Sequence, residues 1–125
     1  MKNFLRQTAP FLVPVPDNKI IEEHFGMASI FAGDFSIAHI IAPAGWSEPH
    51  QTPDFDEVTM VVRGRKLIEV DGERIELQPG ESVFIRRGAR VRYSNPFEAE
   101  AEYWSVCIPA FTIERVHREE ESHFA

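Results

Sequence analysis

A histidine and a glutamate lie seven residues apart in one short stretch of the chain, His50 and Glu57. A carboxyl enclosed by apolar strand residues has a raised pKa, and beside an imidazole it can exchange protons near neutral pH. The two residues therefore form a candidate catalytic pair that transfers a proton, with or without a metal ion. The alternative interpretation is a hydrogen-bonded structural pair that stabilises the turn between them.

A cluster of arginines concentrates positive charge in this acidic chain: Arg86, Arg87, Arg90 and Arg92. Guanidinium groups bind carboxylates and phosphates well. Arg90 and Arg92 alternate with apolar neighbours, so they are expected to point away from the interior and toward surface carboxylates. Arg86 and Arg87 are the better candidates for contact with a ligand.

Short β-rich runs separated by turn residues must position these side chains. The runs cover residues 28–32, 35–42, 57–62, 66–70, 73–77, 82–85, 89–94 and 101–108. Asp71 and Gly72 form a strong hairpin signal, because both central positions of such a turn need positive φ. Strands at this spacing predict an all-β sandwich or barrel.

The pattern divides the chain into three segments. Residues 1–27 are rich in proline and apolar residues, which predicts an extended arm that packs along the barrel or is exchanged with a partner. A disordered tail is the alternative. Residues 28–109 form the barrel, and the charged residues 110–125 form a short helix or a frayed tail.

Composition limits the classes of function. The chain has 125 residues and a net charge of −7, which fits one domain and disfavours nucleic acid and anionic membranes as partners. No apolar run approaches the length of a membrane span. The single cysteine excludes an intrachain disulfide and is typical of a reducing cytoplasm, where we expect the protein to work.

Two groups of residues resemble the two sequence motifs of the cupin superfamily, whose fold is a double-stranded β-helix or jelly-roll barrel. The first motif is matched by Gly45, His50, Thr52, Glu57 and Gly64, with Thr52 at the place of its second histidine. The second is matched by Gly80, Arg86, Gly88, Val91 and Asn95, with Arg86 in place of proline and Val91 in place of histidine. The resemblance spans residues 35–108 and implies a single cupin barrel.

Cupin metalloenzymes hold a divalent transition metal with two histidines and a glutamate of the first motif and one histidine of the second. This chain keeps only His50 and Glu57 of that set, so the sequence predicts loss of the ordinary metal site and no required cofactor. The alternative is a bound metal held by His50, Glu57 and His39, if the face of residues 35–42 that carries His39 lines the barrel.

The resemblance leaves three hypotheses for function. They are a cupin that binds a small polar or anionic molecule, a metal-dependent isomerase, lyase or dioxygenase, and a non-catalytic sensor or assembly module. The expected ligand pocket comprises His39, Thr52, Thr59, Val83, Arg86, Val91, Tyr93 and Trp104. The resemblance also implies a homodimer that forms through the sheets.

Residues 55–94 are similar to the cupin domain of the ethanolamine-utilisation protein Q, which also carries the aspartate and glutamate found here at Asp56 and Glu57. That family is associated with acetate kinase activity and with bacterial microcompartments. A second resemblance is to ectoine synthase, on the ending at residues 107–125. Only Glu57 of that enzyme's iron ligands has a counterpart here, because Val83 and Val91 stand at the other positions.

Overall fold

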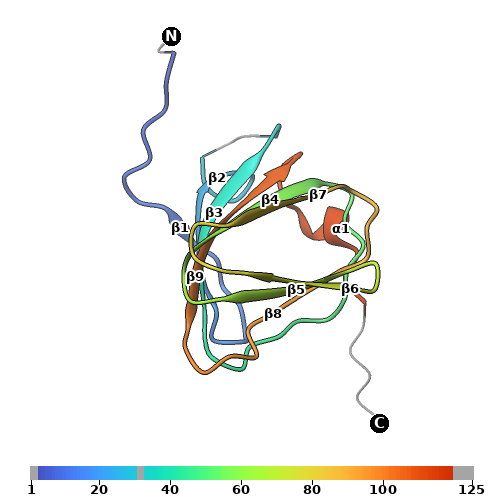
Figure 1. Cartoon of the computed structure of the whole chain (residues 1–125). Coiled ribbons are helices and arrows are strands. Elements are labelled where there is room, and N and C mark those ends of the chain that lie inside the picture. The colour runs from blue at the N-terminus through green and yellow to red at the C-terminus, as the bar shows by residue number, and fades with distance from the viewer. Residues whose placement is uncertain (1–2, 31–32, 120–125) are drawn as a thin grey trace.

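The computed structural model describes residues 3–30 and 33–119. Within them the chain forms nine strands and one short helix (Figure 1). The strands are β1 (Phe11–Leu12), β2 (Ile20–Phe25), β3 (Ser36–Ala42), β4 (Asp56–Arg63), β5 (Lys66–Val70), β6 (Glu73–Leu77), β7 (Ser82–Ile85), β8 (Val91–Ser94) and β9 (Ala101–Ile108), and the helix is α1 (Ile113–Val116).

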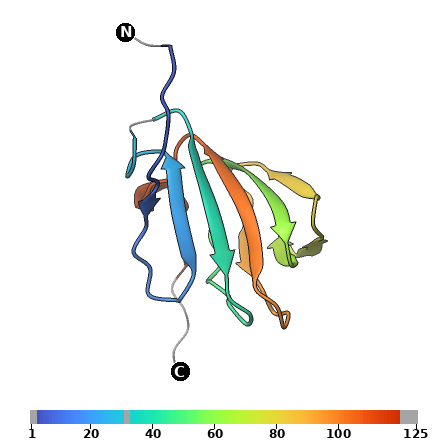
Figure 2. The same ribbon diagram turned by 90° about the vertical axis from the view of Figure 1, so that its left-hand side faces the viewer.

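The strands form two antiparallel sheets that face each other across one interior (Figures 1 and 2). The large sheet has the order β1-β2-β3-β9-β4-β7, and the small sheet has the order β6-β5-β8. The β5–β6 hairpin turns at Asp71 and Gly72, which both have positive φ. The all-β barrel expected from the sequence is confirmed.

The large sheet begins earlier in the chain than the sequence suggested. Strand β2 lies within residues 1–27 and pairs along its length with β3, from Ile20 opposite Ile41 to Phe25 opposite Ile37. The strand expected at residues 28–32 is not formed at 28–30, which are bends, and residues 31 and 32 lie outside the described part of the chain. Paired β-branched residues at the start of β2 therefore extend the barrel into the expected arm.

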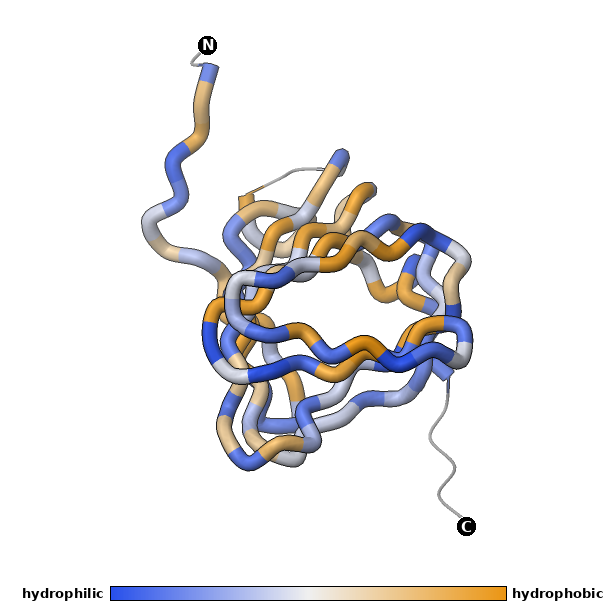
Figure 3. Tube along the Cα trace, viewed as in Figure 1, coloured by the Kyte–Doolittle hydropathy of each residue, from blue (hydrophilic) through white to orange (hydrophobic). Residues whose placement is uncertain are grey.

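The core lies between the inner faces of the two sheets. Apolar and polar residues alternate along several strands (Figure 3), as the two-residue period of a strand requires. The buried residues of the main cluster come from both sheets: Ile40, Ala42, Trp46, Val61, Ile68, Leu77, Ile85, Val91, Tyr93, Ala101 and Tyr103. Side chains from β3, β4, β7 and β9 thus pack against those of β5, β6 and β8.

Helix α1 covers a second, smaller cluster. Thr112 caps the helix, and its side-chain oxygen accepts a hydrogen bond from the backbone N–H of Arg115. Val116 then packs with Phe55 and Cys107. Part of the charged C-terminal segment is therefore helical and packed on the barrel.

No helix in the described residues is long and apolar enough to cross a membrane.

Residues that precede β2 close the gap between the two sheets. The indole N–H of Trp46 donates to Asp17 Oδ2 at 2.7 Å. Lys19 Nζ lies 3.4 Å from Glu48 Oε2 and 4.1 Å from the centroid of the Trp46 ring. These contacts join the residues just before β2 to the segment that contains Trp46 and Glu48 and runs beside β8.

The two sequence motifs meet at one end of the barrel. The backbone N–H of Gly45 donates to the carbonyl of Asn95, and the N–H of Asn95 donates to the carbonyl of Trp46, both at 2.7 Å. The Asn95 side-chain amide is buried and lies 3.0–3.2 Å from the carbonyls of Ala42, Pro43 and Ala99. Asn95 is therefore a structural residue that satisfies the backbone of two loops.

Replacement of Gly64 by alanine should destabilise the protein strongly. Gly64 has φ of +76°, and a Cβ there would overlap Glu100 O and lie 2.9 Å from Ala101 Cα. Gly72 is the matched control, because its φ is +87° but a Cβ there would meet nothing within 4 Å. We expect Gly72→Ala to cost about 1 kcal/mol and Gly64→Ala at least about 2 kcal/mol more in urea unfolding. Equal losses would contradict the close approach of the two loops.

Candidate functional site

A buried polar cluster occupies the interior of the barrel between the two sheets. It comprises Glu57 and Thr59 of β4, Lys66 of β5, Tyr93 of β8 and Ser105 of β9, and we call it the barrel cluster. Strand alternation places these side chains inside, because Thr59 pairs with Ser105 and Tyr93 pairs with Ile68. The cluster therefore brings together an amine, a carboxyl and three hydroxyls in an otherwise apolar interior.

Glu57 provides the carboxyl of the barrel cluster. Its side chain is buried, and its Oε1 accepts a hydrogen bond of 2.8 Å from the Tyr93 hydroxyl. Burial raises the pKa of Glu57 above its ordinary value, although the Lys66 charge and the Tyr93 hydroxyl act in the opposite direction. Glu57 can therefore hold a proton at a pH where an exposed glutamate would have lost it.

Lys66 provides the amine. Its side chain is only 2% exposed, and its Nζ donates to Thr59 Oγ1 at 3.0 Å. The same atom lies 3.5 Å from the ring centroid of Tyr103 and 4.3 Å from that of Tyr93. Burial lowers the pKa of Lys66 to about 7, although the charge of Glu57 acts against the shift. Such an amine is partly neutral at physiological pH.

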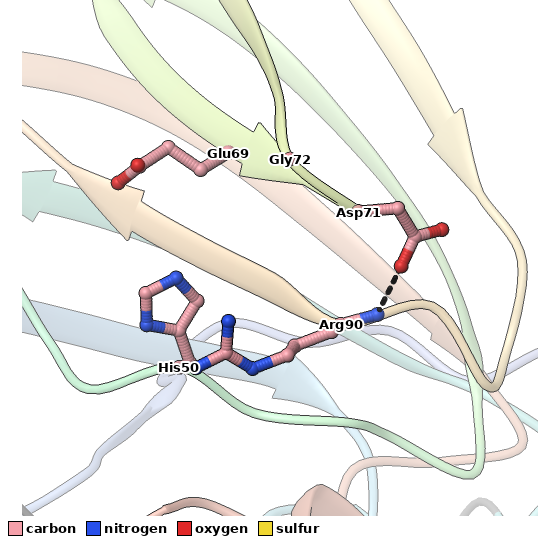
Figure 4. A pocket seen from close by; sticks show the side chains of 5 residues that line it. All are labelled: His50, Glu69, Asp71, Gly72 and Arg90. Carbon is pink, nitrogen blue, oxygen red and sulfur yellow. Dashed lines mark hydrogen bonds between the residues drawn. The ribbon is translucent and has the colours of Figure 1, made fainter.

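His50 and Glu57, the expected catalytic pair, are not brought together. Gln51 pairs with Val91, which faces the core, so the Gln51 side chain is buried and His50 points to the other side. His50 lines a surface pocket of about 310 Å³ with Glu69, Asp71, Gly72 and Arg90 (Figure 4). The prediction that His50 and Glu57 form a proton-transfer pair is therefore wrong, because His50 lies outside the barrel interior.

His39 and Trp104 lie on the outer face of the large sheet, and their expected place in the pocket is wrong. His39 Nε2 lies 2.7 Å from Glu102 Oε2, and its Nδ1 lies 3.0 Å from Glu22 Oε1. Burial alone would lower the pKa of His39, but the hydrogen bonds to the two carboxylates raise it above its ordinary value. The centroid of the Trp104 ring lies 5.0 Å from that of the His39 ring, and the two rings are tilted by 51°. This histidine ties three neighbouring strands together.

The arginines are also outside the barrel. Arg87 binds Asp56 Oδ2 at 3.2 Å, and the exposed Arg86 lies over the ring of Phe84 on the outer face of β7. Arg90 binds Glu119 at 2.7 Å and Arg92 lies 3.5 Å from Glu69, as expected for surface pairs. Arg86 is therefore not part of the barrel interior, where the ligand pocket was expected.

Of the other expected pocket residues, four line the interior of the barrel and one does not. The four are Thr59, Val83, Val91 and Tyr93. Thr52 lies in the loop before β4, where its backbone N–H donates to the carbonyl of His117.

Sequence reasoning missed four interior polar or aromatic residues: Gln51, Lys66, Tyr103 and Ser105. A signal for Lys66 was present, because alternation from the apolar residues Ile68 and Val70 puts Lys66 on the same face. The same alternation on β9, counted from Cys107, puts Tyr103 and Ser105 on the inner face. Lysine is seldom buried in proteins, so periodicity alone is a weak signal for it.

The interior donors do not fit the divalent metal that the sequence resemblance implies. The inward positions in the segment before β4 belong to Gln51 and Pro53, and Val91 faces them from β8. Within residues 3–30 and 33–119, no three His, Cys, Asp or Glu side chains are grouped so that they could hold one ion. Glu57 is the one carboxylate of the cluster, and the Lys66 amine already acts on it electrostatically. Neutral amide and hydroxyl groups beside an ammonium are a poor donor set for a transition metal.

Comparison with known proteins places this geometry in a family. The family model described as the cupin domain matches residues 38–109. The chain is 45% identical over 108 residues to the endoribonuclease YbeY of Myxococcus xanthus strain DK1622, and the match covers 86% of this chain and 37% of that protein. The chain thus spans little more than a third of that relative's length.

Two solved structures share the fold. The polyketide cyclase RemF from Streptomyces resistomycificus matches with a TM-score of 0.74 and 16% identity over 98% of this chain and 89% of its own. An RmlC-like cupin from Shewanella frigidimarina matches with a TM-score of 0.70 and 16% identity over 88% of this chain and 93% of its own. These structures support the barrel topology, and the family model covers more than half of the chain, so this protein belongs to the cupin domain family.

Proposed function

We propose that this cupin domain binds a small anionic or polar molecule inside its barrel without a metal ion, and that Lys66 is the anchoring group. The observation that carries the proposal is the buried Lys66 amine, whose hydrogen-bond partner within the described residues is the neutral Thr59 hydroxyl. Cupin barrels that use a metal place a positive charge inside the barrel, and here a lysine supplies that charge.

The hydrogen bonds of Lys66 support a ligand with oxygen acceptors. An ammonium has three N–H donors, and Thr59 accepts one of them at 3.0 Å. The remaining contacts are the ring faces of Tyr93 and Tyr103. Within the described part of the chain, no carboxylate lies within ion-pair distance of this amine. A carboxylate or carbonyl oxygen of a ligand would complete the set.

Glu57 and Tyr93 give the proposed site a means to hold or move a proton. Burial favours the protonated form of Glu57, which leaves the Lys66 charge free to attract an anion. The Tyr93 hydroxyl donates to Glu57 Oε1, and Ser105 also hydrogen-bonds to this carboxyl. The site can therefore offer a charge-assisted donor and a neutral acid from opposite sheets.

Endoribonuclease activity is not part of the proposal. The relative with that name is matched over only 37% of its length. The net charge of −7 and the exclusion of all four clustered arginines from the barrel also disfavour an RNA substrate.

We also propose that a second copy of this chain covers the outer face of the large sheet. Met60 and Val62 of β4, Phe84 of β7 and Ile108 of β9 are each 43–52% exposed there. Their exposed area is roughly 350 Å², comparable to the largest apolar patch of a typical monomer. Adjacent outward residues such as Val58 and Val106 extend the face toward the area of about 800 Å² per partner that a stable dimer needs. A two-fold axis would bring the same apolar face of each copy together.

Removal of the Lys66 amine should abolish binding of small anions. In the wild-type protein, titration with acetate should shift the amide NMR signals of Thr59 and Tyr103, because the carboxylate replaces the missing acceptors. Lys66→Met should weaken acetate binding by at least about tenfold, the value of one charge-assisted hydrogen bond. Arg86→Ala is the control, since that arginine is outside the barrel. Binding that is lost in Arg86→Ala but kept in a folded Lys66→Met would refute the proposal, and circular dichroism would check folding.

The buried amine should make stability rise with pH in a way that depends on Lys66. Its folded-state pKa is about 7, below the value of about 10.4 for a free lysine, so the unfolded chain binds more protons between these values. The measurement uses the Glu57→Gln variant, in which Lys66 titrates without its coupled carboxyl. The difference in free energy of unfolding between this variant and the Glu57→Gln, Lys66→Met double variant should grow from pH 7 to 9, by at most about 1.4 kcal/mol per pH unit. A difference that stays constant in urea unfolding would show that the amine is not desolvated.

Charge on the outer face should prevent self-association. Phe84→Lys combined with Met60→Lys places ammonium groups in the proposed interface, where like charges from two copies would meet. We expect a dimer mass for the wild type and a monomer mass for this variant in sedimentation equilibrium. Ile113→Lys, on helix α1 and away from the sheet, is the control and should remain dimeric. A wild-type monomer would contradict the proposed partner.

A further inference from the structure

Lys66 differs from an ordinary structural lysine in the groups around it. The sequence has three lysines, Lys2, Lys19 and Lys66. Lys19 follows the usual pattern, because it pairs with Glu48 and lies over the Trp46 ring. Lys66 is more deeply buried, and among the described residues its hydrogen-bond partner is a neutral hydroxyl. No acidic group in that part of the chain lies within hydrogen-bonding distance to hold this amine in the charged form.

The groups near Lys66 are those that condensation of an amine with a carbonyl compound requires. The Thr59 hydroxyl touches the amine, and Ser105 Oγ lies 3.5 Å from Thr59 Oγ1. The Tyr93 ring contacts the amine while its hydroxyl donates to Glu57. A nucleophilic nitrogen thus lies beside the Thr59 and Ser105 hydroxyls, and Ser105 also hydrogen-bonds to the buried Glu57 carboxyl.

We propose that Lys66 forms an imine with a small aldehyde or ketone that enters the barrel. This inference rests on the proposed function, because it names a substrate class for the same site and adds a covalent step to binding. An anionic group elsewhere on the substrate is not required, since the carbonyl oxygen itself can accept hydrogen bonds from the cluster.

The step balances without an outside oxidant or reductant. The lone pair of the neutral Lys66 amine attacks the carbonyl carbon, a C–N bond forms, and the carbonyl π bond breaks as its oxygen accepts a proton. Protonated Glu57 donates a proton to the resulting hydroxyl, which leaves as water. The nitrogen has then lost its two protons, one to the oxygen and one back to Glu57, and a C=N bond joins Lys66 to the substrate.

The electrostatics of the barrel agree with this geometry. Burial lowers the pKa of Lys66 to about 7, so about half of the amine is neutral at that pH. An exposed lysine with a pKa of about 10.4 has a neutral fraction roughly a thousand times smaller. Burial also raises the pKa of Glu57, which favours the protonated form that the step requires.

Reductive trapping tests the inference on the intact protein. Acetaldehyde and cyanoborohydride at pH 7 should convert the imine to a stable ethyl amine, and peptide mass spectrometry would locate it. We expect Lys66 to be ethylated at least about tenfold faster than Lys19, because burial leaves the Lys66 amine partly neutral at this pH. Lys19 is an internal reference in the same molecule, and urea-unfolded protein should lose the preference. Labelling of Lys19 at the same rate or faster would overturn the inference.

Two further measurements separate this inference from the proposed function. Glu57→Gln should slow ethylation of Lys66 and shift its pH profile, since the acid is lost while the amine remains. Unchanged rate and profile in this variant would overturn the role of Glu57 in the step. Acetate has the size of acetaldehyde but cannot form an imine. If acetate binds and acetaldehyde does not label Lys66, the covalent step is refuted and the proposed function stands, whereas absence of both refutes both.

Discussion

The pairing of Gln51 with Val91 decides which side chains of the segment before β4 enter the barrel. Each residue donates its backbone N–H to the other's carbonyl at 2.8 Å. Because side chains alternate along a strand, a slip of one residue would exchange the two faces. The observed register sends Gln51 inward and His50 outward to the surface pocket. At this place the interior therefore holds the amide of Gln51, where a metal-binding cupin presents an imidazole. The reactive groups of the interior come from other strands.

Lys66 of β5 supplies an amine to the barrel interior, and its burial costs free energy. Burial of an ammonium is unfavourable unless donors and charge are compensated. The structure compensates it with the Thr59 hydroxyl and with the π faces of Tyr93 and Tyr103, which attract a cation in a dry environment. No carboxylate contacts the amine in the described part of the chain, so compensation is incomplete. This incomplete compensation is the basis of the proposed role of Lys66 as a ligand anchor.

The sequence predicted the barrel because glycine turns and short strands are local signals. Glu57 and Thr59 of β4 and Val91 and Tyr93 of β8 could be placed inside by alternation alone. The orientation of β3 could not, because both of its faces are apolar and His39 sits on a face with Ile37 and Ile41. The segment around His50 has no regular alternation, since prolines flank it, and only pairing with β8 fixes its faces. Lys66 could not be placed inside with the same certainty, because lysine is seldom buried and the period of its strand is then a weak signal.

The two proposals for the barrel differ by one proton. In the first, Lys66 is an ammonium beside a protonated Glu57, and in the second, Lys66 starts as a neutral amine beside the same protonated carboxyl. Lower pH therefore favours the anchor, and higher pH favours the nucleophile. The ligand acts in addition, because an anion favours the ammonium through its charge, while a carbonyl compound reacts only with the neutral amine. Burial lowers the pKa of Lys66 to about 7, so both forms of the amine are present near neutral pH, which lets the proposed site act both as an anchor and as a nucleophile.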